Sequence, residues 1–323
     1  MPSISVVVPA FNTATYIGAT LESLGKQTFR DFEVIVVDDG STDDTKSLAS
    51  ACIARLGLNG GVVSRPGNLP KGVASCRNHG VSQAVGTWIA FLDSDDLFEP
   101  NKLERVVGLL KAPGTSALAL HHAVMPFDDA TVEPAGAPEV GDGGRGTSSL
   151  DDLLTDNSIA TSSVVVNREC FASLGGFDSR LNGVEDYWLW LRIAKRGEWS
   201  YLPEALTRYR LRRGSLMGGR SLTHYVDQYT KLLAIADRCN ELSVAELGRL
   251  RRSIFSGPLR YYTSVAYQSG GLAVMLRGLC LLAFRGFPAD SGRILYRQTR
   301  AIALGSAQRT TRRLGVSSRN LFS

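Results

Sequence analysis

The sequence has little of what marks secreted or membrane-spanning proteins. Only five of its 323 residues are cysteines, and they are scattered without a CxxC pair or a short framework. This usage favours a reduced, cytosolic setting. The first apolar run has no basic residues before it and ends at Pro9, which argues against a secretory signal. The most apolar late stretch, residues 271–287, contains Arg277 and Arg285 and is too short to span a bilayer.

Two common nucleotide-binding signatures are also missing. No GxGxxG follows the first apolar run, and no GxxxxGK[ST] occurs in the chain. A dinucleotide-binding oxidoreductase and a P-loop phosphotransferase are therefore disfavoured. A nucleotidyltransferase that makes an activated sugar is disfavoured as well, because no glycine- and arginine-rich signature follows the first run.

The charges are unevenly distributed along the chain. Hydrophobic residues make up 44% and charged residues 21%, which is typical of a globular protein, and the net charge is +5. Residues 241–323 contain thirteen Arg and Lys but three Asp and Glu, whereas residues 1–240 contain 23 basic and 28 acidic groups. We therefore expect a mildly acidic catalytic body over residues 1–220 and a helical, basic extension over residues 221–323.

Apolar, β-branched runs alternate with segments of helical spacing in the first third of the chain. The expected strands are 4–8, 33–37, 61–64 and 88–92, and the expected helices are 15–26, 43–55 and 72–84. Thr42 is the expected cap of the second helix. This alternation predicts an α/β fold, with a Rossmann-like, mainly parallel sheet flanked by helices. Later signals predict helices at 150–155, 168–174 and 185–196, a strand at 160–166, and helices from about 221.

Polar clusters follow three of the expected strands, at residues 9–12, 38–41 and 93–96. Ligands of open α/β sheets bind beyond the carboxyl ends of the strands, so these clusters should meet at one edge. In an extended segment Asp93 and Asp95 would point the same way, and a divalent cation would relieve their repulsion. Mg²⁺ or Mn²⁺, bound by one or two carboxylates and substrate phosphates, fits this pattern. The alternative is that residues 93–96 only cap the next helix.

Six motifs along the chain, taken together, resemble family 2 of the inverting glycosyltransferases, which have the GT-A fold. They are VVVPAFN at 6–12, VDDGSTD at 37–43, KGVASCRNHG at 71–80, FLDSDD at 91–96, GGFD at 175–178 and EDYWLWL at 185–191. The resemblance covers about residues 1–215. It implies a donor half at 1–115, an acceptor half at 150–220, and a nucleotide-sugar donor that is usually UDP-linked.

The resemblance also implies roles for the donor half. Pro9, Ala10 and Asn12 would lie along the nucleoside, and Asp39 would accept a hydrogen bond from the uracil imide.

The resemblance assigns the diphosphate and the metal to the acidic loop. Asp95 would bind the metal that bridges the diphosphate, Asp93 would meet the ribose or the metal, and Asp96 would be a third carboxylate. Arg77 would hold Asp93 or the donor sugar; the alternative is a solvated position on its helix.

Inverting transfer needs a base for the acceptor hydroxyl and positive charge on the departing diphosphate. Glu185 and Asp186 open a strongly apolar helix, where a carboxylate is partly desolvated and its pKa rises. In the resembled family the Asp of this pair is the base, which implies Asp186, with Glu185 positioning the acceptor. The alternative is that both acids only favour the helix N-terminus.

Residues 209–215 resemble the loop that closes over the diphosphate in this family. Arg212 stands where many members have a histidine that ligates the metal or contacts the pyrophosphate. Arginine cannot ligate a metal, but it pairs well with phosphate oxygens, so Arg210 and Arg212 are expected diphosphate contacts.

The basic extension has two interpretations. It would lie on the anionic inner face of a membrane, where a lipid-linked or glycan acceptor is found, or it would pack on a second subunit of a homo-oligomer. Nucleic-acid binding is disfavoured, because no aromatic side chains interleave the arginines as stacking platforms.

The resulting hypothesis is a metal-dependent, cytoplasmic or peripheral inverting glycosyltransferase that builds a surface polysaccharide or related glycan. The alternative is a catalytically silent sugar-nucleotide-binding or scaffolding protein with the same fold. The presence of Asp39, Asp95 and Asp186 argues against that alternative.

Overall fold

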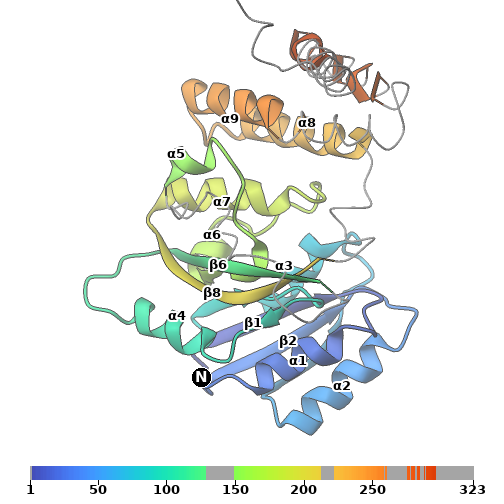
Figure 1. Cartoon of the computed structure of the whole chain (residues 1–323), viewed down its shortest axis with the longest axis vertical. Helices are drawn as coiled ribbons and strands as arrows, with labels where there is room; N and C mark the ends of the chain where they lie inside the picture. The colour runs from blue at the N-terminus through green and yellow to red at the C-terminus, as the bar shows by residue number, and fades with distance from the viewer. Residues whose placement is uncertain are drawn as a thin grey trace, which may run out of the picture. The chain divides into compact units, whose positions relative to one another are not determined.

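The computed structural model describes residues 2–128, 149–211 and 222–257, with short stretches between 259 and 295. The chain divides into two compact units, Met1–Gly219 and Arg220–Ser323. The first unit is a mixed α/β structure built on one eight-stranded sheet, so the predicted fold class is confirmed (Figure 1). The described part of the second unit is helical.

The sheet of the first unit has the strand order β3-β2-β1-β4-β7-β6-β8-β5. Its strands are β1 Ile4–Ala10, β2 Phe32–Asp38, β3 Gly60–Ser64, β4 Trp88–Phe91, β5 Leu97–Phe98, β6 Ala119–Asp128, β7 Val165–Asn167 and β8 Trp199–Leu211. The first four strands are parallel. Strand β7 is antiparallel to β4 and β6, β8 is parallel to β6, and β5 is antiparallel to β8. The mainly parallel arrangement therefore holds for strands β1 to β4, and the rest of the sheet is mixed.

Strand β1 lies inside the sheet and is buried at every position from Ile4 to Ala10. Its continuous apolar run is what a parallel strand covered on both faces requires. Strand β2 pairs with β1 on one side and β4 pairs with it on the other, so the direction in which the strands are laid down reverses at β1. Such a switch point leaves a crevice beyond the carboxyl end of the strand, where ligands of open α/β sheets bind.

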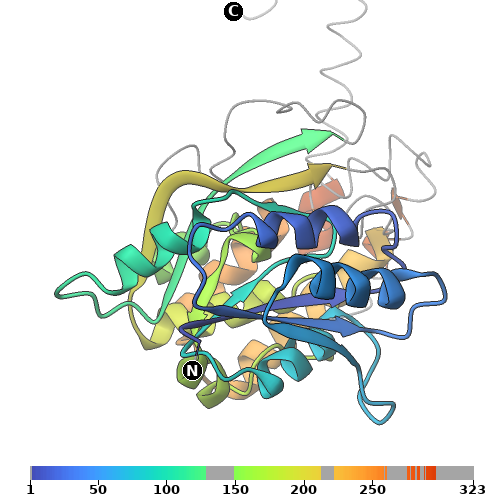
Figure 2. The same cartoon turned by 90° about the horizontal axis from the view of Figure 1, so that it is seen from below.

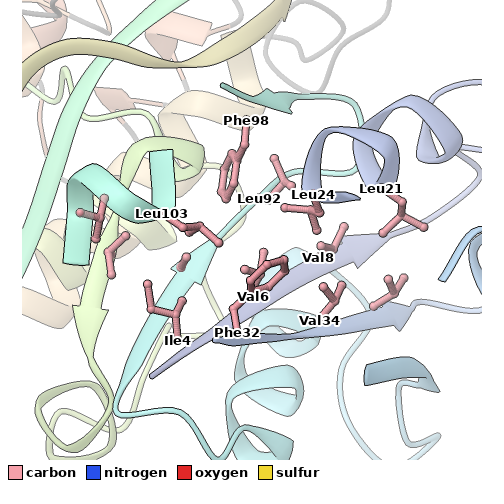
Figure 3. Close-up of a cluster of buried hydrophobic side chains, with 14 of the residues drawn as sticks. Ile4, Val6, Val8, Leu21, Leu24, Phe32, Val34, Leu92, Phe98 and Leu103 are labelled. Atoms are coloured by element: carbon pink, nitrogen blue, oxygen red, sulfur yellow. The ribbon is translucent and has the colours of Figure 1, made fainter. Parts of the chain in front are cut away.

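Helices cover both faces of this sheet. They are α1 Ile17–Gly25, α2 Thr45–Leu56, α3 Val73–Gln83, α4 Lys102–Leu110, α5 Leu150–Leu153, α6 Arg168–Ser173 and α7 Glu185–Arg196. Helices α1 and α2 lie side by side (Figures 1 and 2). Leu21 and Leu24 of α1 and Leu103 of α4 pack with Val6 and Val8 in a buried cluster (Figure 3).

The opposite face is covered in part by α3, which packs closely on β1. A Cβ at Gly80 would lie 2.4 Å from Val7 Cγ1, so this approach requires glycine. The ring of Phe91 lies 5.2 Å from the ring of Phe177 and 6.5 Å from that of Trp190 in α7. These aromatic contacts fix the N-terminal half of the sheet to the segment that contains α7.

Three local predictions are wrong. The second helix begins at Thr45, not at 43, and Thr42 does not cap it: Asp43 accepts the hydrogen bond from the Thr45 amide at 3.1 Å. The strand expected at 160–166 is a 3₁₀ turn, Thr161–Ser163, followed by the short β7. The loop expected from 209 is still strand at Leu211, because β8 pairs with β6 as far as that residue.

The second unit contains α8 Leu222–Cys239 and α9 Val244–Ser256. Ser243 and Glu246 form a capping box at the start of α9, where the Ser243 amide donates to Glu246 at 2.7 Å. Within the described parts of the chain, no helix combines the length and apolar character needed to cross a membrane. Most of the basic residues beyond 257 lie outside the described residues.

Candidate active site

The loops after β1, β2 and β4 lie at the same edge of the sheet, because these three strands are parallel and adjacent. The sequence predicts this convergence, and the strand pairing confirms it. The backbone amide of Asp39 donates to the carbonyl of Ala10 at 2.9 Å, which joins the first two loops. The candidate site is built around this edge.

The carboxylate of Asp39 is held in place by its neighbours. Arg65 donates to one oxygen, and the backbone amide of Gly72 donates to the other at 2.9 Å. Gly72 has a φ of 124°, a conformation that side-chain-bearing residues rarely adopt. Asp39 is therefore a buried, oriented acceptor beside the start of α3.

Asn12 shapes the loop after β1 with its amide group. Its Oδ1 accepts from the Thr42 amide at 2.8 Å, and its own backbone amide donates to Ser41 Oγ at 3.0 Å. Pro9 and Ala10 are buried at the end of β1. Phe11, by contrast, is 51% exposed. No role is predicted for Phe11 from the sequence, although an aromatic residue between Ala10 and Asn12 was a visible signal.

Residues 93–96 form a tight turn, not the extended segment that the sequence suggested. The amide of Asp96 donates to the carbonyl of Asp93 at 3.0 Å, which closes the turn. Asp96 is 1% exposed; its Oδ1 accepts from the Arg210 amide at 2.9 Å, and its buried Oδ2 has no hydrogen-bond partner. Burial and the charges of Asp93 and Asp95 raise the pKa of Asp96 well above its usual value.

Arg77 of α3 connects the acidic turn with α7. The residue is 3% exposed, so it is not on a solvated helix face. Its guanidinium donates to Asp93 Oδ1 at 2.7 Å and to Glu185 Oε1 at 3.2 Å. The acidic turn and the first residue of α7 thus share one buried cation.

Asp186 lies at the start of α7 with both carboxylate oxygens bonded. Thr161 Oγ1 donates to Oδ2 at 3.0 Å, and the Tyr187 amide donates to Oδ1 at 2.6 Å. Burial, together with the charge of Glu185, raises the pKa of Asp186 to about 6, although Arg77 opposes the shift. This is the range in which a carboxylate exchanges protons near neutral pH.

Glu185 has different surroundings from those that direct contact with an acceptor would need. It is 3% exposed; one oxygen accepts from Arg77 and the other from the Gly183 amide. Its carboxylate therefore binds groups of the protein itself, the Arg77 guanidinium and the Gly183 amide.

The end of β8 lies against the acidic turn. Arg210 Nε donates to the carbonyl of Asp95 at 2.6 Å, and its guanidinium lies over the rings of Tyr16 and Phe127, 4.9 and 4.4 Å from the centroids. Burial and the negative charges of the site raise the pKa of Tyr209. Arg212, the other predicted diphosphate contact, lies outside the described residues.

The donor set of the acidic turn fits a hard divalent cation. Three carboxylates fall within one turn, and the buried, unpartnered Oδ2 of Asp96 is poorly stabilised without positive charge. Within the described ranges, no three His, Cys, Asp or Glu side chains are grouped closely enough to hold an ion. An ion at this turn would need further oxygen ligands from a bound molecule.

Residues 5–135 match the family described as glycosyl transferase family 2. A Mycobacterium tuberculosis protein named as a PGL/p-HBAD biosynthesis glycosyltransferase is 27% identical over 271 residues, which cover 83% of this chain and 98% of the relative. A Bacillus subtilis glycosyltransferase named for teichuronic acid biosynthesis is 28% identical over 221 residues, covering 68% and 83%.

Solved structures share the fold. Staphylococcus aureus TarS 1–349 in complex with UDP-GlcNAc has a TM-score of 0.64 at 20% identity, and the match covers 99% of this chain and 93% of TarS 1–349. A mannosyltransferase from Pyrobaculum calidifontis in complex with GDP-Man and Mn²⁺ has a TM-score of 0.60 at 19% identity, over 93% and 86%. The family match over residues 5–135 and the named relatives together support a family 2 glycosyltransferase.

Proposed function

We propose that the chain transfers a sugar from a nucleotide-diphosphate donor, UDP-linked, to a hydroxyl acceptor with inversion at the anomeric carbon. One observation carries the proposal. Asp186, whose pKa is raised to about 6, follows Glu185 in the chain, and Arg77 bonds both Glu185 and Asp93 of the acidic turn. Such an arrangement offers a base for one side of a displacement and a cation site for the other.

Asp186 is the proposed base. Thr161 and the Tyr187 amide fix its carboxylate, and the deprotonated form takes the proton from the acceptor hydroxyl as that oxygen attacks the anomeric carbon. A pKa close to the working pH leaves the base mostly ionised and still able to accept the proton. Glu185 is 3% exposed and bonded to Arg77 and the Gly183 amide, whereas Asp186 is only partly buried, so we assign Glu185 to positioning Arg77 instead of the acceptor.

The nucleoside is proposed to lie at the edge formed by Asp39 and Asn12. A carboxylate has about four acceptor sites, so Asp39 still has capacity for the imide of a uracil beside Arg65 and Gly72. The exposed ring of Phe11 adds a flat apolar surface for the base. The fold neighbours were solved with UDP-GlcNAc and with GDP-Man, so the choice of UDP rests on Asp39.

Asp95, with Asp93 and Asp96, is proposed to hold Mg²⁺ or Mn²⁺ against the donor diphosphate. When bound, the ion would supply positive charge to the departing nucleoside diphosphate. Arg210 holds the Asp95 carbonyl and the Asp96 carboxylate, so it fixes the shape of the turn. Arg212 is proposed as a further diphosphate contact, because its guanidinium pairs well with phosphate oxygens and it stands where many members of the family have a histidine.

Residues 1–220 are proposed to carry out the transfer. The basic extension at 221–323 is proposed to contact the membrane surface where the acceptor lies. The named relatives act in glycan biosynthesis, and a surface polysaccharide or lipid-linked acceptor at the inner membrane face fits the thirteen basic residues of 241–323. Sedimentation with anionic vesicles, with neutral vesicles as the control, tests the membrane contact; a homo-oligomer is the alternative outcome.

The decisive experiment is release of the nucleoside diphosphate from a panel of UDP- and GDP-sugars by the full-length protein. Asp186→Asn should abolish transfer while donor binding, measured by calorimetry, persists. Asp237→Asn, in an exposed position of α8, is the matched control and should leave both unchanged. NMR of the product gives the anomeric configuration. Donor binding without turnover on any acceptor would instead support the silent binding protein.

A further inference from the structure

Lys102, the first residue of α4, is a lysine with no exposed surface. Burying an ammonium group is costly, and among the described residues no carboxylate forms an ion pair with it. Burial lowers the pKa of Lys102 well below its usual value, against the opposing charge of Asp96. A leucine would fill this position at a lower cost in free energy, so the contacts of the Lys102 amino group need an explanation.

The amino group of Lys102 is bonded to the 3₁₀ turn Thr161–Ser163. Lys102 Nζ donates to the carbonyl of Ser162 at 2.7 Å and to Thr207 Oγ1 at 3.2 Å. Thr207 Oγ1 in turn donates to the same Ser162 carbonyl at 3.0 Å. The ammonium also lies 3.3 Å from the centroid of the Phe98 ring. Lys102 of α4 and Thr207 of β8 therefore hold one carbonyl of the 3₁₀ turn Thr161–Ser163, and Phe98 of β5 packs against the ammonium.

The same turn contacts both parts of the candidate site. Thr161 Oγ1 donates to Asp186 Oδ2 at 3.0 Å, and Ser162 Oγ accepts from the Asp93 amide at 3.0 Å. These two residues are neighbours in the chain, so a shift of the turn changes the position of the base and of the acidic turn together. No other described contact of the turn carries a buried positive charge.

We propose that Lys102 is a positioning residue that clamps the Thr161–Ser163 turn and so sets the placement of Asp186 relative to Asp93. The inference rests on the proposed function, in which these two carboxylates serve the acceptor and the donor. Lys102 touches neither substrate; it acts through the Ser162 carbonyl. Displacements of about 1 Å at a reacting centre cost roughly 100-fold in rate, so a clamp remote from the chemistry matters.

Three variants test the clamp. Lys102→Met keeps the length and burial of the side chain but removes the donor, and Thr207→Val removes the hydroxyl that shares the contact. Val106→Ala, one turn further along α4 in the apolar core, is the matched control for a disturbed helix. Thermal unfolding of all three shows whether they fold.

The first readout is hydrogen exchange, which does not depend on transfer. The amide of Asp93 and that of Val164, which bonds the Thr161 carbonyl, should exchange at least tenfold faster in Lys102→Met than in wild type. Val106→Ala should leave these two amides unchanged. Equal exchange in Lys102→Met and wild type would overturn the clamp, even if the wild-type protein transfers no sugar and the proposed function fails.

The second readout is kinetic. In Lys102→Met we expect kcat to fall about 10- to 100-fold, because the base is misplaced, while the donor KM changes less than threefold. Thr207→Val should lose rate in the same direction, and the double variant should lose less than the product of the two single effects. A kcat loss in Lys102→Met no larger than in Val106→Ala would reduce Lys102 to a structural role.

Discussion

Arg77 and Asp93 form a partly buried ion pair of 2.7 Å, and the same guanidinium reaches Glu185 at 3.2 Å. One cation therefore neutralises a carboxylate from each half of the fold. The Asp93 side chain is 33% exposed and that of Glu185 is 4% exposed, so the pair with Glu185 has much less help from water. This asymmetry makes Arg77 more important for Glu185 than for Asp93.

Arg77→Met should therefore destabilise the protein strongly, by about 3–5 kcal/mol, because it leaves the Glu185 carboxylate buried and unpaired. Urea unfolding at pH 7 measures the change. The control is Arg55→Met, which breaks an exposed pair with Glu22 and should leave stability nearly unchanged. Equal effects of the two substitutions would show that the buried pair does not support the fold.

Phe11→Ala should weaken donor binding without weakening the fold. The ring is 51% exposed, so its removal costs little core packing, whereas stacking of a base on an aromatic ring is worth ~1–3 kcal/mol. Calorimetric titration with UDP should show a Kd increase of roughly 10-fold. Val85→Ala, at another exposed apolar position, is the control, and unchanged affinity in Phe11→Ala would exclude a stacking role.

Gly80→Ala should destabilise the first unit. The added methyl group would lie 2.4 Å from Val7 Cγ1, and overpacking of this kind costs about 1–3 kcal/mol. Gly108→Ala in α4 is the opposite case, since no atom lies within 4 Å of the added Cβ and alanine is the better helix former. Opposite shifts in unfolding temperature for the two variants would confirm the close packing of α3 on β1.

The sequence predicts the parallel sheet of β1 to β4 well, because these strands are apolar runs and polar loops follow three of them directly. The candidate site is harder to predict, because its contacts join distant segments. An arginine in a helix, such as Arg77, is usually expected at the surface, and its partner Glu185 is 108 positions away in the sequence. From the sequence, Lys102 is likewise expected to be exposed to solvent, and its partners Ser162 and Thr207 lie 60 and 105 positions away. Local patterns carry no information on such pairs.

The turn Thr161–Ser163 shows the same limit at shorter range. Three valines follow the turn directly at 164–166, a β-branched run typical of a strand, and the sequence accordingly predicts a strand over residues 160–166. The structure instead uses the two hydroxyl groups of Thr161 and Ser162 to bind Asp186 and the Asp93 amide. Side-chain hydrogen bonds with residues outside the segment have overridden the intrinsic preference.

Mn²⁺ should stabilise the protein through the acidic turn, most strongly when UDP is also present. A ligand at 100 times its Kd stabilises the folded state by about 2.7 kcal/mol, so the unfolding temperature should rise. Asp95→Asn should lose most of this shift, and Asp44→Asn, at the exposed start of α2, should retain it. An equal Mn²⁺ response of wild type and Asp95→Asn would exclude the turn as the metal site, and donor affinity unchanged by chelation would argue against metal dependence.

The raised pKa of Asp186 gives a prediction for the pH dependence of transfer. A general base must be deprotonated, so kcat should fall as the pH drops through about 6, the pKa to which burial and Glu185 raise this group. Arg77 lowers the pKa of Asp186, so a variant without that charge, such as Arg77→Met if it folds, should shift the acid limb to higher pH. A rate that stays constant down to pH 5 would exclude Asp186 as the base.

The same shift predicts that the proposed base lowers the stability of the fold. The pKa of Asp186 is about 6 in the folded state against 3.8 for an ordinary Asp, so between these values the folded protein holds the proton more tightly than the unfolded chain. Stability therefore decreases as the pH rises from about 4 to 6, and the loss is complete above that range. Asn at this position keeps one oxygen that accepts from the Tyr187 amide, and its NH₂ group can donate to the Thr161 hydroxyl, so both contacts are possible without the buried charge. Asp186→Asn should thus abolish transfer yet raise stability at pH 8 by roughly 1–3 kcal/mol, with no gain at pH 4; a variant less stable than wild type at pH 8 would contradict the assignment.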